Sequence, residues 1–218
     1  MTSRLTALQG RLLEVLAAVT PRWTLTGGAA LAGFHLHHRS TRDLDLFWRG
    51  RDVLDREVED SIAVIRGADF EVNVLQRAAG FARLQVRDTR EQVIVDLVAE
   101  PVPAIEPPVE AKAGHRTIQL DSLHEILVNK LGALLHRAEL RDLIDLQALL
   151  ERGGDLARAM TDAARKDAGF SPVTLGWTLQ SFPVHKQAEI AGLEREDVAG
   201  LVAFREQLAR RVANLAKP

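Results

Sequence analysis

Hydrophobic and polar residues alternate along this chain with two different periods. Apolar residues recur every three to four positions through residues 4–19, which predicts an amphipathic helix. The stretch "DLDLFW" (43–48) alternates with period two, which predicts a strand with leucines on one face and aspartates on the other. The same reasoning predicts, in the first half of the chain, strands at 22–26, 70–76, 81–88 and 91–99 and helices at 29–38 and 51–68.

The segment 100–116, "EPVPAIEPPVEAKAGHR", breaks this pattern. Its four prolines exclude a regular helix or a central strand, and we interpret it as a boundary or a long surface loop before a short strand at 117–120. From Ser122 onward the apolar period is helical. It predicts helices at 122–137, 139–151 and 155–167 and two or three more to residue 215.

This order of elements predicts an α+β fold in two domains. Residues 1–116 form an N-terminal domain with a small mixed β-sheet, and residues 117–218 form a mainly helical C-terminal domain, an α-helical bundle. The length of 218 residues allows one large domain or two small ones and is enough to bury a core.

Composition narrows the class of protein. A hydrophobic content of 46% and a charged content of 27% are typical of a globular chain. The absence of cysteine excludes disulfides, thiolate metal sites and a cysteine nucleophile. No apolar run is long enough to cross a bilayer, so we expect a cytoplasmic protein with no membrane partner. The net charge of −2 does not favour nucleic acid, although the cations are mostly arginines, which suit phosphate contacts.

Three aspartates are the main candidates for chemistry. Asp43 and Asp45 share one face of a predicted strand, and their mutual repulsion is relieved by a cation, for which magnesium is the natural choice. Asp96 lies in "VIVDLV", where an unpaired charge is costly. If the two strands are neighbours, the three carboxylates converge on a pair of metal ions. Alternatively, the first two are solvated edge residues and Asp96 pairs with Arg83 or Arg87.

A pair of glycines and a group of histidines precede these aspartates. Gly27-Gly28 connects a predicted strand to a helix, which suits either a phosphate site at backbone N–H groups or a plain tight turn. His35 and His37 point apart on a helix and cannot bind one zinc ion. We therefore interpret His35, His37 and His38 as helix-end residues, with His38 as a candidate border of the active site.

The motifs in this order resemble a known family. "TGGAALAGFHLHHRSTRDLDLFW" followed by "VIVDLV" resembles the polymerase-β-like nucleotidyltransferase superfamily, and more narrowly the AbiEii/AbiGii toxin family, to which MenT-type toxins belong. The later segment "KLGALLHRAELRDLIDLQALL" (130–150) is similar to a helical motif of that family. The matching positions are Lys130, Ala133, Arg137, Arg141, Asp142 and Asp145.

The resemblance implies transfer of a nucleoside monophosphate from a nucleoside triphosphate to an acceptor, with two Mg²⁺ ions, or Mn²⁺ in their place, as cofactors. Asp43, Asp45 and Asp96 would hold the metals, and Lys130 would stabilise phosphate charge. The superfamily's phosphate-contacting serine is absent after Gly27, which leaves backbone N–H groups, Thr26 or Ser40 for that role. The other residues that the resemblance assigns to nucleotide or phosphate binding are Gly27, Gly28, Arg39, Arg137 and Asp145.

Asp142 and Asp145 have two interpretations: they orient Lys130 or Arg137 by ion pairing, or they clamp helices together. For the whole protein the leading hypothesis is a toxin of a type IV-like toxin–antitoxin or phage-defence system. It would modify the 3′ end of tRNA or another RNA and have a cognate antitoxin as partner. The alternatives are a nucleotidyltransferase for a protein or a small molecule such as an aminoglycoside, and a non-catalytic nucleotide-binding partner protein.

Overall fold

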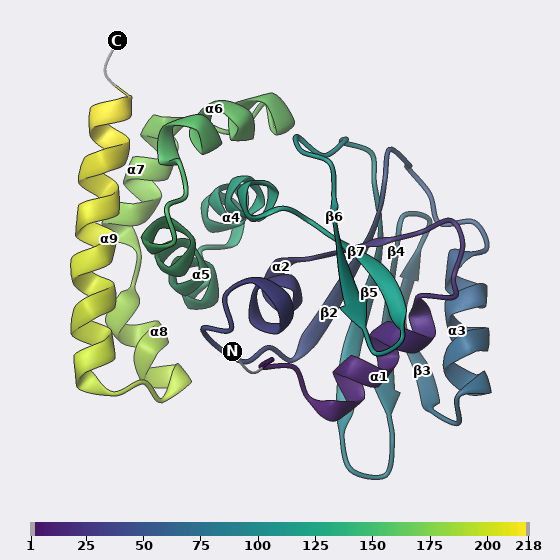
Figure 1. The fold of residues 1–218 in the computed structure, drawn as a ribbon. Helices are drawn as coiled ribbons and strands as arrows, with labels where there is room; N and C mark the ends of the chain where they lie inside the picture. The colour runs from purple at the N-terminus through teal and green to yellow at the C-terminus, as the bar shows by residue number, and fades with distance from the viewer. Residues whose placement is uncertain (1–2, 217–218) are drawn as a thin grey trace. The chain divides into compact units, whose positions relative to one another are not determined.

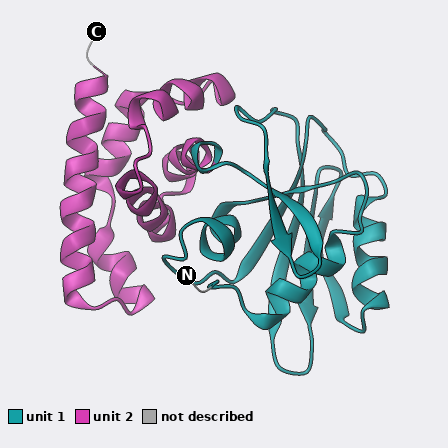
Figure 2. Ribbon diagram, viewed as in Figure 1, with its two compact units in different colours: residues 1–125 teal, residues 126–218 magenta. Residues whose placement is uncertain are grey.

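The computed structural model describes residues 3–216. By its internal contacts the chain divides into two compact units, residues 1–125 and 126–218 (Figure 2). The division falls within helix α4 (Leu123–Arg137), and the boundary expected at residues 116/117 falls upstream of it, at the start of strand β7. No helix among the described residues is both long and apolar enough to span a membrane.

The described part of the first unit contains one seven-stranded mixed sheet (Figure 1). Its strand order is β3-β4-β5-β2-β1-β7-β6. β2 pairs in parallel with β5, and β1 pairs in parallel with β7, whereas the other neighbours are antiparallel. The strands are β1 (Thr24–Thr26), β2 (Asp43–Arg49), β3 (Glu71–Ala78), β4 (Phe81–Arg87), β5 (Gln92–Glu100), β6 (Val109–Ala113) and β7 (Arg116–Leu120).

Strand β6 was not expected, because the four prolines pointed to a loop through residue 116. The prolines end at Pro108, and the residues that follow pair with β7 as a hairpin at the edge of the sheet. An edge position tolerates a proline-flanked strand, because one side of the strand makes no ladder hydrogen bonds. The interpretation of 100–116 as a loop is therefore wrong for residues 109–113.

Helices α1 (Ala7–Leu16) and α3 (Glu57–Gly67) pack against each other, and α1 also contacts β5, β6 and β7. α1 begins with a capping box in which the Thr6 hydroxyl accepts from the Gln9 backbone N–H. The core beneath it is aliphatic, with Leu8, Leu12 and Leu13 fully buried. α1 and α3 are shorter than the predicted helices at 4–19 and 51–68.

The second unit is helical throughout its described residues. It continues α4 with α5 (Leu140–Glu151), α6 (Leu156–Lys166), α7 (Pro172–Ser181), α8 (Val184–Ala191) and α9 (Arg195–Leu215). α9 packs along α7, α8 and α5 and is coloured yellow in Figure 1. The predicted fold class, an α+β N-terminal half with a mixed sheet and a helical C-terminal half, is confirmed.

Candidate active site

The aspartates lie on two strands that are direct neighbours. β2 and β5 run parallel, and Asp45 is paired with Asp96 across them. Asp43 lies two residues before Asp45 and so on the same face of β2. Leu44 and Leu46 occupy the opposite face and are fully buried. The three carboxylates can converge only if these two strands are neighbours, and the structure confirms that they are.

Asp96 is bound to an arginine from the next strand. Arg83 on β4 is paired with Asp96 in the sheet, and its Nε and Nη2 donate to the two carboxylate oxygens at 2.8 and 2.7 Å. The Asp96 side chain is 9% exposed and that of Arg83 45%. Asp96 raises the pKa of Arg83, and the negative charges of Asp43 and Asp45 add to that shift. The Arg83 guanidinium is therefore stabilised by the negative charge of all three carboxylates.

Of the two partners considered for Asp96, the structure selects Arg83. Arg87 lies farther along β4 and donates to Glu71 on β3. Asp43 and Asp45 are partly exposed, but they are not edge residues, because β2 lies inside the sheet between β5 and β1.

The glycine pair lies against Asp45 and Arg39. Gly27 opens helix α2 (Gly27–Ala30) with a φ of 63°, and a Cβ at this position would lie 2.8 Å from Asp45 Oδ2. At Gly28, a Cβ would lie 2.9 Å from Arg39 Nη2 and 3.0 Å from Thr41 Oγ1. The left-handed φ favours glycine at position 27, and at both positions an added Cβ would displace a side chain from residues 39–45.

Thr41 is a residue of this site that sequence reasoning missed. Its hydroxyl donates to Asp43 Oδ1 at 2.8 Å, and its backbone oxygen accepts from Gln9 Nε2 of α1 at 3.1 Å. Thr41 is buried. A hydroxyl two residues before the first aspartate of an Asp-x-Asp strand was the signal that could have identified it.

The three histidines do not all lie on one helix, contrary to the prediction from the sequence. The helix that begins at Gly27 continues as the π-helical turn η1 (Leu31–His35) and ends there, not at residue 38. His37 has a φ of 54°, which a helix cannot contain. His35 Nε2 lies 2.9 Å from the Asp121 backbone oxygen, and burial lowers the pKa of His35.

Lys130 belongs to the second unit, where it is buried between two carboxylates. Its Nζ lies 2.7 Å from Asp142 Oδ1 and 2.7 Å from Asp145 Oδ2, and the two aspartates are fully buried. Arg137 also binds Asp142, with its Nε and Nη2 each 2.8 Å from a carboxylate oxygen. Burial raises the pKa of Asp142, but Arg137 and Lys130 outweigh it and hold the pKa below its ordinary value.

Of the two interpretations of Asp142 and Asp145, ion pairing with Lys130 and Arg137 is therefore what the structure contains. The pairs also join α4 to α5, so the orienting and clamping roles coincide in one cluster. Among residues 3–216, no group of three or more His, Asp and Glu side chains is arranged to hold a metal ion.

Substituting Gly27 with alanine should lower the free energy of unfolding by about 1–2 kcal/mol, because a left-handed φ is costly for alanine. The methyl group would also displace the Asp45 carboxylate. Urea denaturation measures the first effect. Gly10→Ala is the matched control: it lies inside α1 with no atom within 4 Å of the added carbon, and it should stabilise by about 0.5–1 kcal/mol. Equal stability of the two variants would contradict the close contact at Gly27.

Comparison with known families gives one match across nearly the whole chain. Residues 11–213 match the family described as "Nucleotidyl transferase AbiEii toxin, Type IV TA system". A comparison with curated proteins found no match.

Two solved structures share the fold. A proposed nucleotidyltransferase from H. pylori is 17% identical with a TM-score of 0.57, and the alignment covers 97% of this chain and 98% of that one. JHP933 from Helicobacter pylori is 16% identical with a TM-score of 0.55, with 96% and 95% covered. At these identities the likeness concerns the fold alone.

Proposed function

The chain belongs to the AbiEii family of nucleotidyltransferase toxins, and we propose that it transfers a nucleoside monophosphate from a nucleoside triphosphate to an acceptor hydroxyl. The observation that carries the proposal is that Asp45 and Asp96 are opposite each other on neighbouring strands, beside the turn at Gly27. A side chain on that glycine would collide with the Asp45 carboxylate. In the reaction, the acceptor oxygen forms a bond to the α-phosphorus. The bond from that phosphorus to the β-phosphate oxygen breaks, and pyrophosphate leaves.

Asp43, Asp45 and Asp96 are the residues that would hold a divalent metal. Carboxylate oxygens are the ligand type that Mg²⁺ prefers, with Mn²⁺ as a substitute, and these three carboxylates lie on one face of two adjacent strands. The described side chains are not themselves arranged around a metal ion, and Arg83 binds both oxygens of Asp96, so a bound metal would require that ion pair to rearrange. Two such ions would lower the barrier by activating the attacking hydroxyl and neutralising charge on the leaving pyrophosphate. Asp96 is the carboxylate that we assign to drawing the proton from the acceptor hydroxyl.

The triphosphate would lie against the start of α2. The backbone N–H groups of Gly27 and Gly28 supply donors there, and the Arg39 guanidinium lies over Gly28. We propose that these backbone N–H groups, with the Thr26 or Ser40 hydroxyl, take the place of the superfamily's phosphate-contacting serine, and that Arg39 adds a further phosphate contact. Each of these groups would bind the negatively charged phosphate oxygens, and none would form or break a covalent bond.

We propose that Lys130 stabilises developing phosphate charge, with Asp142 and Asp145 setting the position of its ammonium group. Arg137 and Asp145 are proposed as nucleotide-binding residues on the same helical pair. The support for these roles is the family motif, and the ion pairs within α4 and α5 supply a means of orienting the lysine.

Replacing Arg83 with glutamine should tighten the binding of Mn²⁺ by about tenfold, because it removes a positive charge bound to a proposed metal ligand. Titration calorimetry with Mn²⁺ alone measures this without any turnover. Arg87→Gln is the matched control, since that arginine lies on the same strand and pairs with Glu71 instead. An unchanged or weaker affinity in Arg83→Gln would contradict the assignment of Asp96 to the metal site.

The acceptor that we propose is the 3′ end of tRNA or another RNA, in the cytoplasm, with a cognate antitoxin that blocks the reaction. The support is membership of a type IV toxin–antitoxin family. Incubating the protein with each α-labelled nucleoside triphosphate, Mg²⁺ and a cell extract, and then separating RNA, protein and small molecules, identifies the acceptor. Label in RNA supports the proposal, whereas label only in protein or in a small molecule contradicts the RNA acceptor.

A further inference from the structure

The second unit contains a groove lined by cationic, amide and aromatic side chains. It lies between α5 and α9 and has a volume of about 610 Å³, within the roughly 300–1,000 Å³ that is usual for ligand sites. Its walls carry two arginines, two glutamines and an aromatic ring. The polar and aromatic side chains that line it are those of Gln147, Glu151, Phe204, Gln207, Arg210 and Arg211.

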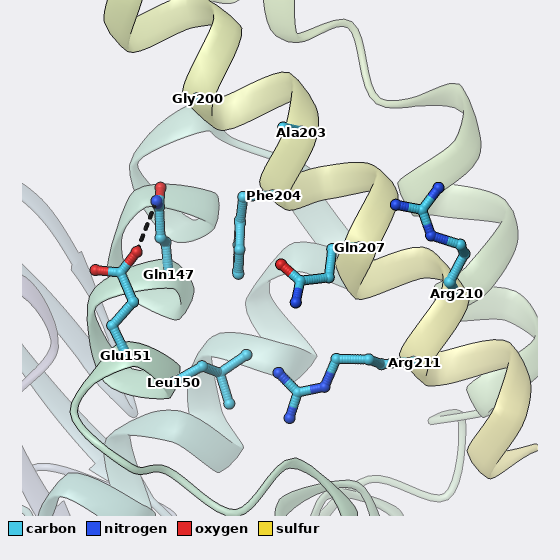
Figure 3. Close-up of a pocket in the computed structure, with 9 residues that line it drawn as sticks. All are labelled: Gln147, Leu150, Glu151, Gly200, Ala203, Phe204, Gln207, Arg210 and Arg211. Carbon is cyan, nitrogen blue, oxygen red and sulfur yellow. Dashed lines mark hydrogen bonds between the residues drawn. The ribbon is translucent and has the colours of Figure 1, made fainter.

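The two arginines have no partner within the described part of the chain. Arg210 and Arg211 are exposed, and neither forms an ion pair or a hydrogen bond there. Arg205, five residues before Arg210 on α9, is in contrast bound to the Gln180 backbone oxygen and to Glu206. In Figure 3 the guanidinium groups of Arg210 and Arg211 point in different directions from α9, so they would contact separate anionic groups.

The rest of the groove offers a flat apolar surface with polar groups beside it. The Phe204 ring lies between Gln147 of α5 and Gln207 of α9 (Figure 3). Gln147 Nε2 donates to Glu151 Oε1 at 2.9 Å, which uses part of the hydrogen-bonding capacity of the one acidic residue lining the groove. Phe204 is half-buried, so one part of the ring is held by packing and another is accessible.

We propose that this groove binds a single-stranded segment of the RNA acceptor, with a base stacked on Phe204 and phosphates on Arg210 and Arg211. The inference rests on the proposed RNA acceptor and names where that RNA is held. Guanidinium groups bind phosphate oxygens well, and base–aromatic stacking tolerates any sequence. A purely acidic polypeptide would use the arginines but would gain nothing from the ring, so the combination favours RNA.

The test is RNA binding by the full chain without nucleotide, measured by fluorescence anisotropy with a labelled single-stranded RNA of mixed sequence. The double variant Arg210→Gln with Arg211→Gln should lose about tenfold or more in affinity. Each lost phosphate contact should reduce the salt slope by about 0.7, so by about 1.4 for two. The matched control removes two exposed cations elsewhere in the same unit, Lys186→Gln with Arg195→Gln, and should bind as the wild type does.

A second variant tests the stacking surface. Phe204→Leu keeps an apolar side chain for packing and should weaken RNA binding about fivefold or more with an unchanged salt slope. Circular dichroism confirms that each variant is folded. RNA affinity and salt slope equal to the wild type in the arginine variant would overturn the proposal, as would equally strong competition by polyglutamate at matched charge.

The binding assay contains no nucleoside triphosphate. It can therefore succeed or fail independently of the proposed nucleotidyl transfer. Loss of RNA binding in the arginine variant, in a protein that transfers no nucleotide, would support the groove and reject the reaction. Nucleotide transfer to a protein, with no RNA binding by the wild type, would reject the groove and keep the chemistry.

Discussion

Replacing Asp45 with asparagine is expected to reduce nucleotide transfer by about a thousandfold while leaving the fold intact. Asparagine has the same shape as aspartate but lacks the negative charge that would hold a divalent cation. Asp45 is paired with Asp96 across β2 and β5, and its carboxylate lies against Gly27. It is therefore close both to another proposed metal ligand and to the proposed triphosphate site.

The rate of label incorporation from an α-labelled nucleoside triphosphate measures this effect, and circular dichroism with urea denaturation confirms folding. Asp52→Asn is the matched control, because this aspartate is exposed and lies outside the strands. It should leave the rate within about twofold of the wild type. If Asp45→Asn kept a tenth or more of the wild-type rate, Asp45 would have no place at the reacting phosphate.

Replacing Lys130 with methionine is expected to lower the free energy of unfolding by about 3–5 kcal/mol. Methionine fills a similar volume but removes a buried cation that two fully buried carboxylates contact, each at 2.7 Å. The loss comes mainly from the desolvated charges of Asp142 and Asp145, which are no longer balanced by the ammonium group. Urea denaturation followed by circular dichroism measures it.

The exposed Lys186 provides the comparison for this substitution, since Lys186→Met should change the unfolding free energy by less than about 0.5 kcal/mol. Adding Asp145→Asn to Lys130→Met should restore part of the lost stability, because the double variant has one buried charge fewer. A Lys130→Met protein as stable as the wild type would show that the cluster does not join α4 to α5.

The parts of the site that sequence patterns predicted are those fixed by local periodicity. The alternation in "DLDLFW" placed Asp43 and Asp45 on one face, and the strand is observed at Asp43–Arg49. The apolar surroundings of Asp96 indicated that it needed a charged partner, and Arg83 provides one. In both cases, the apolar and polar pattern within a single strand identifies the residue that matters.

The parts that sequence patterns missed are those that hydrophobic periodicity does not encode. Val109–Ala113 forms a strand only because β7 offers it a partner at the sheet edge. The helix from Gly27 ends at His35 because His37 adopts a left-handed conformation, which helical periodicity does not encode. Thr41 joins the site through its hydrogen bond to Asp43, and no spacing rule for metal ligands includes a threonine.

In nucleotidyl transfer, the α-phosphoryl group moves together with its nucleoside, and the β- and γ-phosphates leave as pyrophosphate. Nucleotidyl transfer by this chain is tested most directly by parallel reactions with α-labelled and γ-labelled nucleoside triphosphates in the presence of Mg²⁺ and cellular RNA. We expect the α-label to become attached to RNA, the γ-label to appear in pyrophosphate, and both to be lost in Asp45→Asn. Transfer of the γ-label to the acceptor, or no transfer from any of the common nucleoside triphosphates, would contradict nucleotidyl transfer by this site.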